Sequence, residues 1–146
     1  RSRVPFVPTS PSVARRMVLL AKIRREEKVY DLGCGSGTIL FEAEKVGAQC
    51  VGYEIVRPVV WWARFKKHMK RSSVVFYCAD FFQTDISDAD TVFCYLFSGV
   101  MERFYQVHWA SLKIGTRVVS RGFPIAALEP REVSLIGKEK IYIYEK

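Results

Sequence analysis

The stretch Val-Tyr-Asp-Leu-Gly-Cys-Gly-Ser-Gly, residues 29–37, decides the fold of this chain. An apolar strand over residues 29–32 breaks into three alternating glycines, and a helical pattern follows over residues 38–46. These glycines are Gly33, Gly35 and Gly37. Glycine has no Cβ atom, so such a loop can turn sharply and come close to a ligand. A strand, a glycine loop and a helix in succession predict a cofactor loop within an α/β fold.

The spacing of the glycines indicates which cofactor this loop would hold. Dinucleotide-binding loops follow the pattern G-x-G-x-x-G, whereas this chain has G-x-G-x-G preceded by Asp31. The pattern favours S-adenosylmethionine over a nicotinamide cofactor. A turn that only connects a strand to a helix is the alternative, because glycine motifs often do no more than that.

Two later strand ends carry polar groups that suit the same cofactor. A strand over residues 50–54 ends in Glu54, roughly 20 residues after the glycine loop, the spacing at which an acid meets ribose hydroxyls. A third apolar run, residues 74–78, leads to Asp80 and Phe81. There a carboxylate could accept a hydrogen bond from the adenine amino group while the ring packs against the base. We therefore expect three successive strand ends to bind one cofactor.

The composition is typical of one folded domain that spans residues 1–146. The chain is 49% hydrophobic, which excludes a disordered tail. Its four cysteines are far apart and form no C-x-x-C pair, so we expect them to be reduced and the protein to be intracellular and cytoplasmic. His68 and His108 lack partners at metal-ligand spacing, and no metal is expected.

No stretch of this chain predicts a membrane span. The longest uncharged apolar stretch, residues 91–101, is too short to cross a bilayer. The chain begins with Arg1 rather than methionine, so tethering to a membrane or to mitochondria by an upstream segment stays open.

The remaining elements alternate between helix and strand. They are helices over residues 11–27, 58–70 and 99–112, strands over 91–96 and 116–120, and a final pair of strands over 131–137 and 140–144. The last pair has no room for a crossover helix and must be an antiparallel hairpin. The pattern predicts an α/β, Rossmann-like sheet of seven strands, with five parallel strands, a C-terminal antiparallel hairpin and an N-terminal helix.

The helix over residues 58–70 is strongly amphipathic. It turns four large apolar side chains to one side and its basic side chains to the other. The apolar side chains are Trp61, Trp62, Phe65 and Met69. We expect this stripe to be buried and the basic face to be solvated. Because the net charge is +8, the basic face could alternatively bind RNA, an anionic membrane or an acidic partner.

These motifs resemble the class I, seven-β-strand S-adenosylmethionine-dependent methyltransferases, and the resemblance covers most of the chain. Further segments resemble the small archaeal protein-lysine methyltransferases and their mitochondrial relatives, which modify the c-ring protein of ATP synthase or the adenine nucleotide translocase. Those segments are residues 4–9, 15–16, 52–55 and 112–120. The resemblance implies a protein lysine as substrate. It also implies that the segment 1–28 covers the cofactor pocket, with Pro8 and Thr9 as contacts. The mitochondrial members carry a hydrophobic targeting segment ahead of the domain, and these residues contain none.

The end of the fourth strand bears on the substrate. It reads Cys94-Tyr-Leu-Phe-Ser98 and lacks the Asn/Asp-Pro-Pro-Tyr element of methyltransferases that act on planar amides and base amines. A lysine amine needs chiefly to lose its proton and be aimed. Tyr95 is the candidate catalytic residue for this, with a core aromatic as the alternative, while Asp88 and Asp90 are expected only to cap a turn. An RNA or small-molecule methyltransferase and a non-catalytic cofactor-binding module are the alternative functions.

Overall fold

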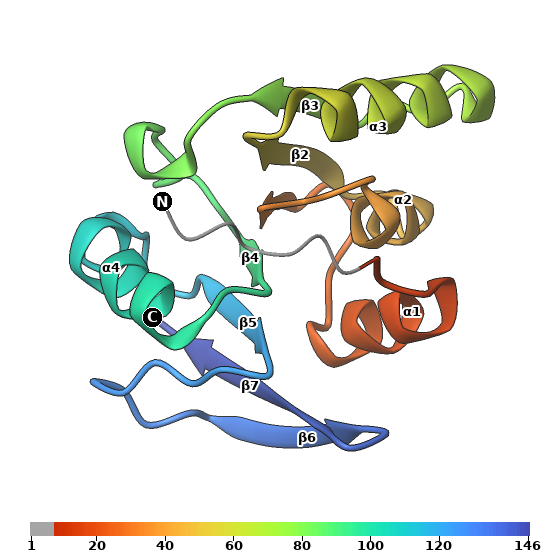
Figure 1. Ribbon diagram of the computed structural model, residues 1–146. Helices are drawn as coiled ribbons and strands as arrows, with labels where there is room; N and C mark the ends of the chain where they lie inside the picture. The colour runs from red at the N-terminus through yellow and green to blue at the C-terminus, as the bar shows by residue number, and fades with distance from the viewer. Residues whose placement is uncertain (1–7) are drawn as a thin grey trace.

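The strands form one seven-stranded sheet in the computed structural model, which describes residues 8–146 (Figure 1). The strands are β1 (Lys28–Leu32), β2 (Gln49–Glu54), β3 (Val75–Cys78), β4 (Thr91–Cys94), β5 (Arg117–Arg121), β6 (Glu132–Ile136) and β7 (Glu139–Glu145). Their spatial order is β3-β2-β1-β4-β5-β7-β6. Strands β1 to β5 are parallel, and β7 runs antiparallel to both β5 and β6. The predicted fold class, with its terminal hairpin, is confirmed.

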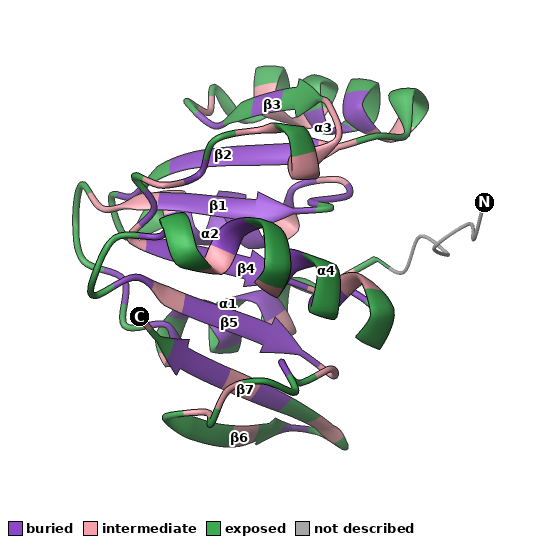
Figure 2. Cartoon of the chain, turned by 90° about the vertical axis from the view of Figure 1, so that its left-hand side faces the viewer, coloured by how far each residue is buried: buried purple, intermediate pink, exposed green. Residues whose placement is uncertain are grey.

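Helices cover both faces of this sheet (Figure 2). The α-helices are α1 (Pro11–Leu20), α2 (Thr38–Lys45), α3 (Arg57–Lys70) and α4 (Ser98–His108), and the short 3-10 helices are η1 (Phe81–Gln83) and η2 (Trp109–Ser111). Alternate strand residues join two separate apolar clusters. Val29 and Phe93 pack with residues of α1, α2 and α3, whereas Tyr30 and Val92 pack with residues of α4. This alternation follows from the two-residue period of a β-strand.

The N-terminal helix is shorter than the sequence predicts. It ends at Leu20, whereas the apolar stripe predicts an end near Glu27. The segment between them adopts left-handed backbone angles at Lys22 (φ 51°) and Glu26 (φ 69°), which a helix cannot contain. The amide of Glu26 donates to the carbonyl of Gly47 at 2.8 Å. The helix therefore ends before Lys22, and the contact between Glu26 and Gly47 holds the following segment in a non-helical conformation.

Strand β4 also ends earlier than predicted. It stops at Cys94, which pairs with Leu32, the last residue of β1. Because the neighbouring strand ends there, the next two residues, Tyr95 and Leu96, leave the sheet and are free to line a cavity.

Helix α3 reverses the predicted orientation of its apolar stripe. Its buried residues are Val60 and Ala63. The large apolar side chains point to solvent instead, with exposed fractions of 68% for Trp61, 55% for Trp62, 54% for Phe65 and 66% for Met69. The expectation that these side chains belong to the core is wrong. Small side chains on the inner face let the helix lie close to β2 and β3, and the bulky ones are left outside.

Candidate functional site

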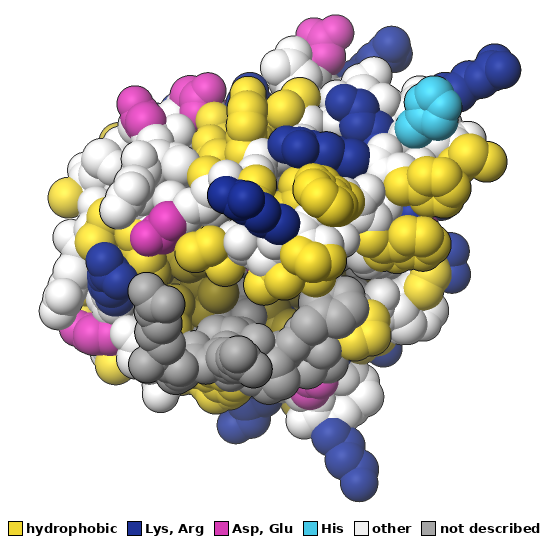
Figure 3. Space-filling view, turned by 45° about the horizontal axis from the view of Figure 1, so that its top comes forward, with side chains coloured by type: hydrophobic (Ala, Val, Ile, Leu, Met, Phe, Trp, Pro, Cys, Tyr) yellow, Lys and Arg dark blue, Asp and Glu magenta, His cyan; other side chains and the backbone are white. Residues whose placement is uncertain are grey.

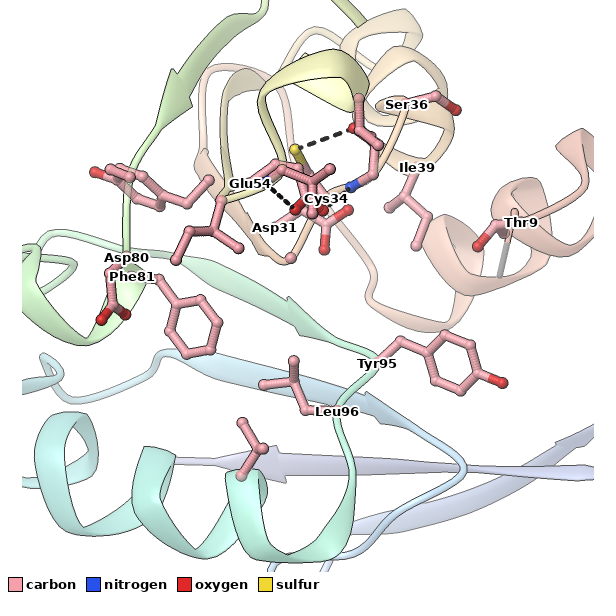
Figure 4. A pocket seen from close by; sticks show the side chains of 18 of the residues that line it. Thr9, Asp31, Cys34, Ser36, Ile39, Glu54, Asp80, Phe81, Tyr95 and Leu96 are labelled. Carbon is pink, nitrogen blue, oxygen red and sulfur yellow. Dashed lines mark hydrogen bonds between the residues drawn. The ribbon is translucent and has the colours of Figure 1, made fainter. Parts of the chain in front are cut away.

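A pocket of about 670 Å³ opens where the carboxyl ends of β1, β2, β3 and β4 meet (Figure 4). Most of the residues proposed from the sequence line it. They are Pro8, Thr9, Asp31, Gly33, Gly35, Glu54, Asp80, Phe81 and Tyr95. Gly37 does not line it. Parallel strands bring their carboxyl ends to one edge of a sheet, which is why motifs distant in sequence gather here.

The glycine loop is fastened to the neighbouring strand. The amides of Gly33 and Cys34 donate to the carbonyl of Tyr53 at 2.8 and 3.0 Å. Gly33 has φ 72° and Gly35 has φ 56°, angles that favour glycine. The loop therefore presents bare backbone to the pocket in a fixed position.

Gly37 has a structural place in the same loop. It is the N-cap of α2 with φ 85°, and a Cβ atom added there would collide with the ring of Phe76. Gly37 does not line the pocket because it lies where the loop joins α2, and there it faces Phe76 of β3.

Glu54 is held at the end of β2 by backbone amides. Its Oε1 accepts from the amide of Gly35 at 3.2 Å, and its Oε2 accepts from the amide of Val56 at 3.0 Å. These bonds fix the carboxylate at the pocket wall. Both oxygens keep free lone pairs with which to accept from a ligand hydroxyl.

Asp31 lies deep in the pocket wall and is only 5% exposed. Burial, and after it the nearby Glu54, raises the pKa of Asp31 to about 8. Two acidic groups thus face one cavity, and the deeper one is mostly protonated at neutral pH. A cationic ligand would favour its ionised form.

The opposite wall comes from the segment after β3. The Oδ1 atom of Asp80 accepts from the amide of Phe82 at 2.9 Å and thereby caps η1. The ring nitrogen Nε2 of His108 donates to the carbonyl of Phe81 at 2.8 Å. These two bonds hold a carboxylate and an aromatic ring together against the cavity.

Tyr95 packs against Arg121, a residue that was not proposed from the sequence. The guanidinium of Arg121 lies 4.4 Å from the centre of the Tyr95 ring. Arg121 also donates to Thr9 Oγ1 at 3.2 Å and to the carboxylate of Glu139 at 2.7 and 3.0 Å. One side chain therefore joins the N-terminal segment, the end of β4 and β7. The contact between Thr9 and Arg121 spans most of the chain, so no local pattern predicts it.

Several further lining residues were not proposed from the sequence. They include Cys34, Ser36, Ile39, Leu96, Val100 and Arg103. Cys34 and Ser36 stand between the loop glycines, so their position did carry a signal. Burial raises the pKa of the Cys34 thiol well above its ordinary value, which makes it a poor nucleophile.

Asp88 and Asp90, which were expected to cap a turn, are instead hydrogen-bonded to residues of β1. The hydroxyl of Tyr30 donates to Asp88 at 2.6 Å, and the amide of Lys28 donates to Asp90 at 2.7 Å.

Within residues 8–146, no three His, Cys, Asp or Glu side chains gather closely enough to hold a metal ion. No helix in that part of the chain is long and apolar enough to cross a membrane.

The predicted N-terminal cover lies partly outside the described residues. Pro8 and Thr9 line the pocket, as the resemblance implied, while residues 4–7 of the same motif fall outside the described range. That the whole segment 1–28 covers the pocket stays a prediction.

Comparison with known proteins agrees with this arrangement. Residues 31–132 match the family described as the ANTKMT methyltransferase domain. The chain is 38% identical to a protein-lysine N-methyltransferase of Saccharolobus islandicus, over 97% of this chain and 92% of that protein. It is 29% identical to the adenine nucleotide translocase lysine N-methyltransferase of Mus musculus, over 99% of this chain but 64% of the mouse protein.

The fold is also similar to that of a solved structure with a ligand. An RNA methyltransferase from Salinibacter ruber, in complex with S-adenosyl-L-homocysteine, superposes with a TM-score of 0.90 and 32% identity. The match covers 95% of this chain and 93% of that one.

Proposed function

Since the chain belongs to the ANTKMT methyltransferase domain family, we propose that it transfers methyl groups from S-adenosylmethionine to lysine side chains of proteins. The protein is a class I S-adenosylmethionine-dependent methyltransferase. The observation that carries the choice of lysine is the 38% identity, over 97% of the chain, to a relative named as a protein-lysine N-methyltransferase.

The donor set of the pocket fits S-adenosylmethionine. Glu54 offers carboxylate oxygens to ribose hydroxyls, and Asp80 and Phe81 offer an acceptor and a ring to adenine. Gly33 and Gly35 leave space beside the backbone for the amino-acid part. Asp31 supplies a second carboxyl group to a cofactor that carries positive charge.

The end of β4 gives this site the properties that an amine acceptor needs. A lysine has an ordinary pKa of about 10.4 and arrives protonated. Tyr95 and Leu96 line the pocket with an aromatic ring and an apolar side chain, which remove water from the amine and lower its pKa. The Tyr95 hydroxyl can accept a hydrogen bond from the neutral amine and direct its lone pair into the pocket.

The reaction is a single displacement. Bound S-adenosylmethionine supplies a methyl group on a sulfonium, and S-adenosylhomocysteine is left when that carbon–sulfur bond breaks. The lysine nitrogen, aimed by Tyr95, forms the new carbon–nitrogen bond with its lone pair. The lysine ammonium gives its proton to bulk water at the mouth of the pocket, and the neutral amine then enters the apolar site beside Tyr95 and Leu96.

An RNA substrate is the second candidate. It is supported by the name of the Salinibacter ruber protein, which is 32% identical to this chain, and by the net charge of +8. The proposal for lysine is favoured because the chain lacks the proline pair after β4 that suits planar base amines.

Labelled methyl transfer tests the proposal and separates the two candidates. The purified protein is incubated with whole-cell extract and S-adenosylmethionine that carries a labelled methyl group, and samples are then treated with protease or nuclease. We expect protease-sensitive label that amino-acid analysis recovers as methyl-lysine. Nuclease-sensitive label would establish the RNA candidate instead. Absence of label, with intact cofactor binding, would leave a binding module without turnover.

A further inference from the structure

Helix α3 exposes a row of large apolar side chains on the outer edge of the molecule. We call Trp61, Trp62, Phe65 and Met69 the α3 crest. Each of these residues is more than half exposed to solvent, and the rings of Trp62 and Phe65 stack at 5.7 Å. Soluble proteins rarely leave such a contiguous apolar patch uncovered unless it meets a partner. None of the four residues lines the pocket, so the methyl-transfer site does not explain the crest.

Helix α3 and its C-cap carry six basic side chains, of which Lys66 and Lys70 lie over the ring of Phe41 in α2. The six are Arg57, Arg64, Lys66, Lys67, Lys70 and the C-cap residue Arg71. Helix α3 contains no aspartate or glutamate. Among residues 8–146, none of these six side chains forms an ion pair, although Arg64 donates to the carbonyl of Phe76. Figure 3 shows hydrophobic and basic side chains interleaved on the face that carries α3. The crest is thus an apolar ridge in a positive field.

We propose that the α3 crest docks the protein onto anionic phospholipid membranes. Tryptophan and phenylalanine rings are favoured at the level of lipid headgroups, and neighbouring lysines and arginines are attracted to anionic lipid phosphates. The helix has the composition of an interfacial amphipathic helix whose apolar side faces outward. Its binding energy comes from the apolar area that the crest buries and from the charges beside it.

The shape and charge of the α3 crest disfavour other partners. Single-stranded nucleic acid binds in grooves whose aromatic rings stack with bases. The crest side chains are instead exposed on α3, which lies beside the edge strand β3 (Figure 1). A second copy docked crest to crest would bring two sets of basic side chains together, and like charges repel. A flat anionic membrane surface can bury the apolar side chains of the crest and attract the basic side chains of the same helix.

Docking would place the pocket close to the bilayer. Ile55 and Val56 line the pocket, are 67% and 48% exposed, and directly precede α3. The pocket rim is therefore continuous with the docking surface. On the proposed function, the lysines within reach would be those that proteins expose beside a membrane.

Vesicle binding tests the proposal without any methyl transfer. The chain has three tryptophans, so in the Trp109→Phe protein the tryptophan fluorescence comes only from Trp61 and Trp62. We expect this protein to sediment with phosphatidylcholine vesicles that contain phosphatidylglycerol and not with phosphatidylcholine alone. On binding, its fluorescence should shift to the blue and be quenched by brominated lipid.

Matched variants assign the binding to the α3 crest. Trp61→Ala, Trp62→Ala and Phe65→Ala combined should weaken vesicle binding at least about tenfold. The control combines Leu19→Ala, Ile114→Ala and Leu135→Ala, which remove exposed apolar side chains elsewhere, and it should bind like the wild type. Thermal unfolding of both variants checks that they fold.

Three results would overturn the proposal. They are absence of binding to anionic vesicles, equal binding by the crest variant and its control, and a crest-dependent affinity for single-stranded RNA or self-association without vesicle binding. Methyl-lysine formation on extract proteins is measured separately. Failure of docking is therefore distinguishable from failure of the proposed function.

Discussion

At the scale of single residues, Asp31 couples the pocket to the stability of the protein. Its pKa is raised to about 8 by burial and by Glu54, against an ordinary value of 3.8. The unfolded chain therefore releases this proton at lower pH than the folded chain, and the free energy of unfolding falls as the pH rises from about 4 to about 8. We predict that Asp31→Asn removes this slope, so that the free energy of unfolding of the variant exceeds that of the wild type at about pH 8. Urea unfolding at acidic and alkaline pH measures both effects.

The control for Asp31 is an exposed carboxylate. Glu132→Gln on β6 should keep the wild-type slope because its side chain stays in water. Identical pH slopes for Asp31→Asn and the wild type would contradict the raised pKa. The same Asp31→Asn variant should bind S-adenosylmethionine more weakly. The ionised carboxylate lowers the stability of the folded protein but attracts the positively charged cofactor, and asparagine carries no charge.

Tyr95 is the residue at which cofactor binding and turnover should separate. Tyr95→Phe keeps the ring against Arg121 and removes only the hydroxyl. We predict that kcat for a lysine substrate falls roughly tenfold to a hundredfold while cofactor affinity changes little, because the hydroxyl aims the amine and does not hold the cofactor. Steady-state kinetics and calorimetry measure the two quantities. Tyr142→Phe on β7, away from the pocket wall, is the matched control, and an unchanged kcat in Tyr95→Phe would remove this residue from the mechanism.

At the scale of elements, the junction between the glycine loop and α2 depends on one glycine. Gly37 has a positive φ, and a Cβ atom there would strike Phe76, whereas Gly115 has a positive φ with open space around it. We predict that Gly37→Ala lowers the free energy of unfolding by roughly 3 kcal/mol and Gly115→Ala by about 1 kcal/mol. Chemical denaturation measures the free energy of unfolding of both variants. The loss in Gly115→Ala gives the cost of backbone strain alone, and the additional loss in Gly37→Ala gives the cost of the collision with Phe76. Equal losses would mean that Phe76 moves aside without cost.

At the scale of the whole molecule, cofactor binding should raise thermal stability. A ligand that binds only the folded state at about a hundredfold excess over its Kd adds about 2.7 kcal/mol. For a chain of this size, we predict that S-adenosylhomocysteine raises the Tm by roughly 5–10 °C. Thermal melts with the ligand measure the effect. The rise should nearly disappear in Glu54→Ala and persist in Glu132→Ala, and a wild type that gains no stability would contradict the assignment of the pocket to this cofactor.

Most of the fold and most of the pocket were predictable because their signals are local. The glycine loop, Glu54 and Asp80 each follow an apolar run, and parallel strands bring those ends to one edge. The terminal hairpin was equally predictable, since two strands joined through Gly137 and Lys138 leave no space for a crossover. Arg121 was not predictable, because its contacts with Thr9, Tyr95 and Glu139 exist only after the strands are assembled.

The sequence by itself determined the order of strands and helices along the chain, the class of cofactor and most of the residues that line the pocket. Those features depend on glycine geometry and on apolar periods that act within about 10 residues. Only the tertiary structure decided that α1 stops at Leu20, that Arg121 backs Tyr95 and that α3 turns its tryptophans outward. A helical period shows that an apolar stripe exists, but packing against the sheet selects the buried face. Here the close approach of α3 to β2 and β3 admitted the small side chains of Val60 and Ala63 and left the α3 crest in solvent.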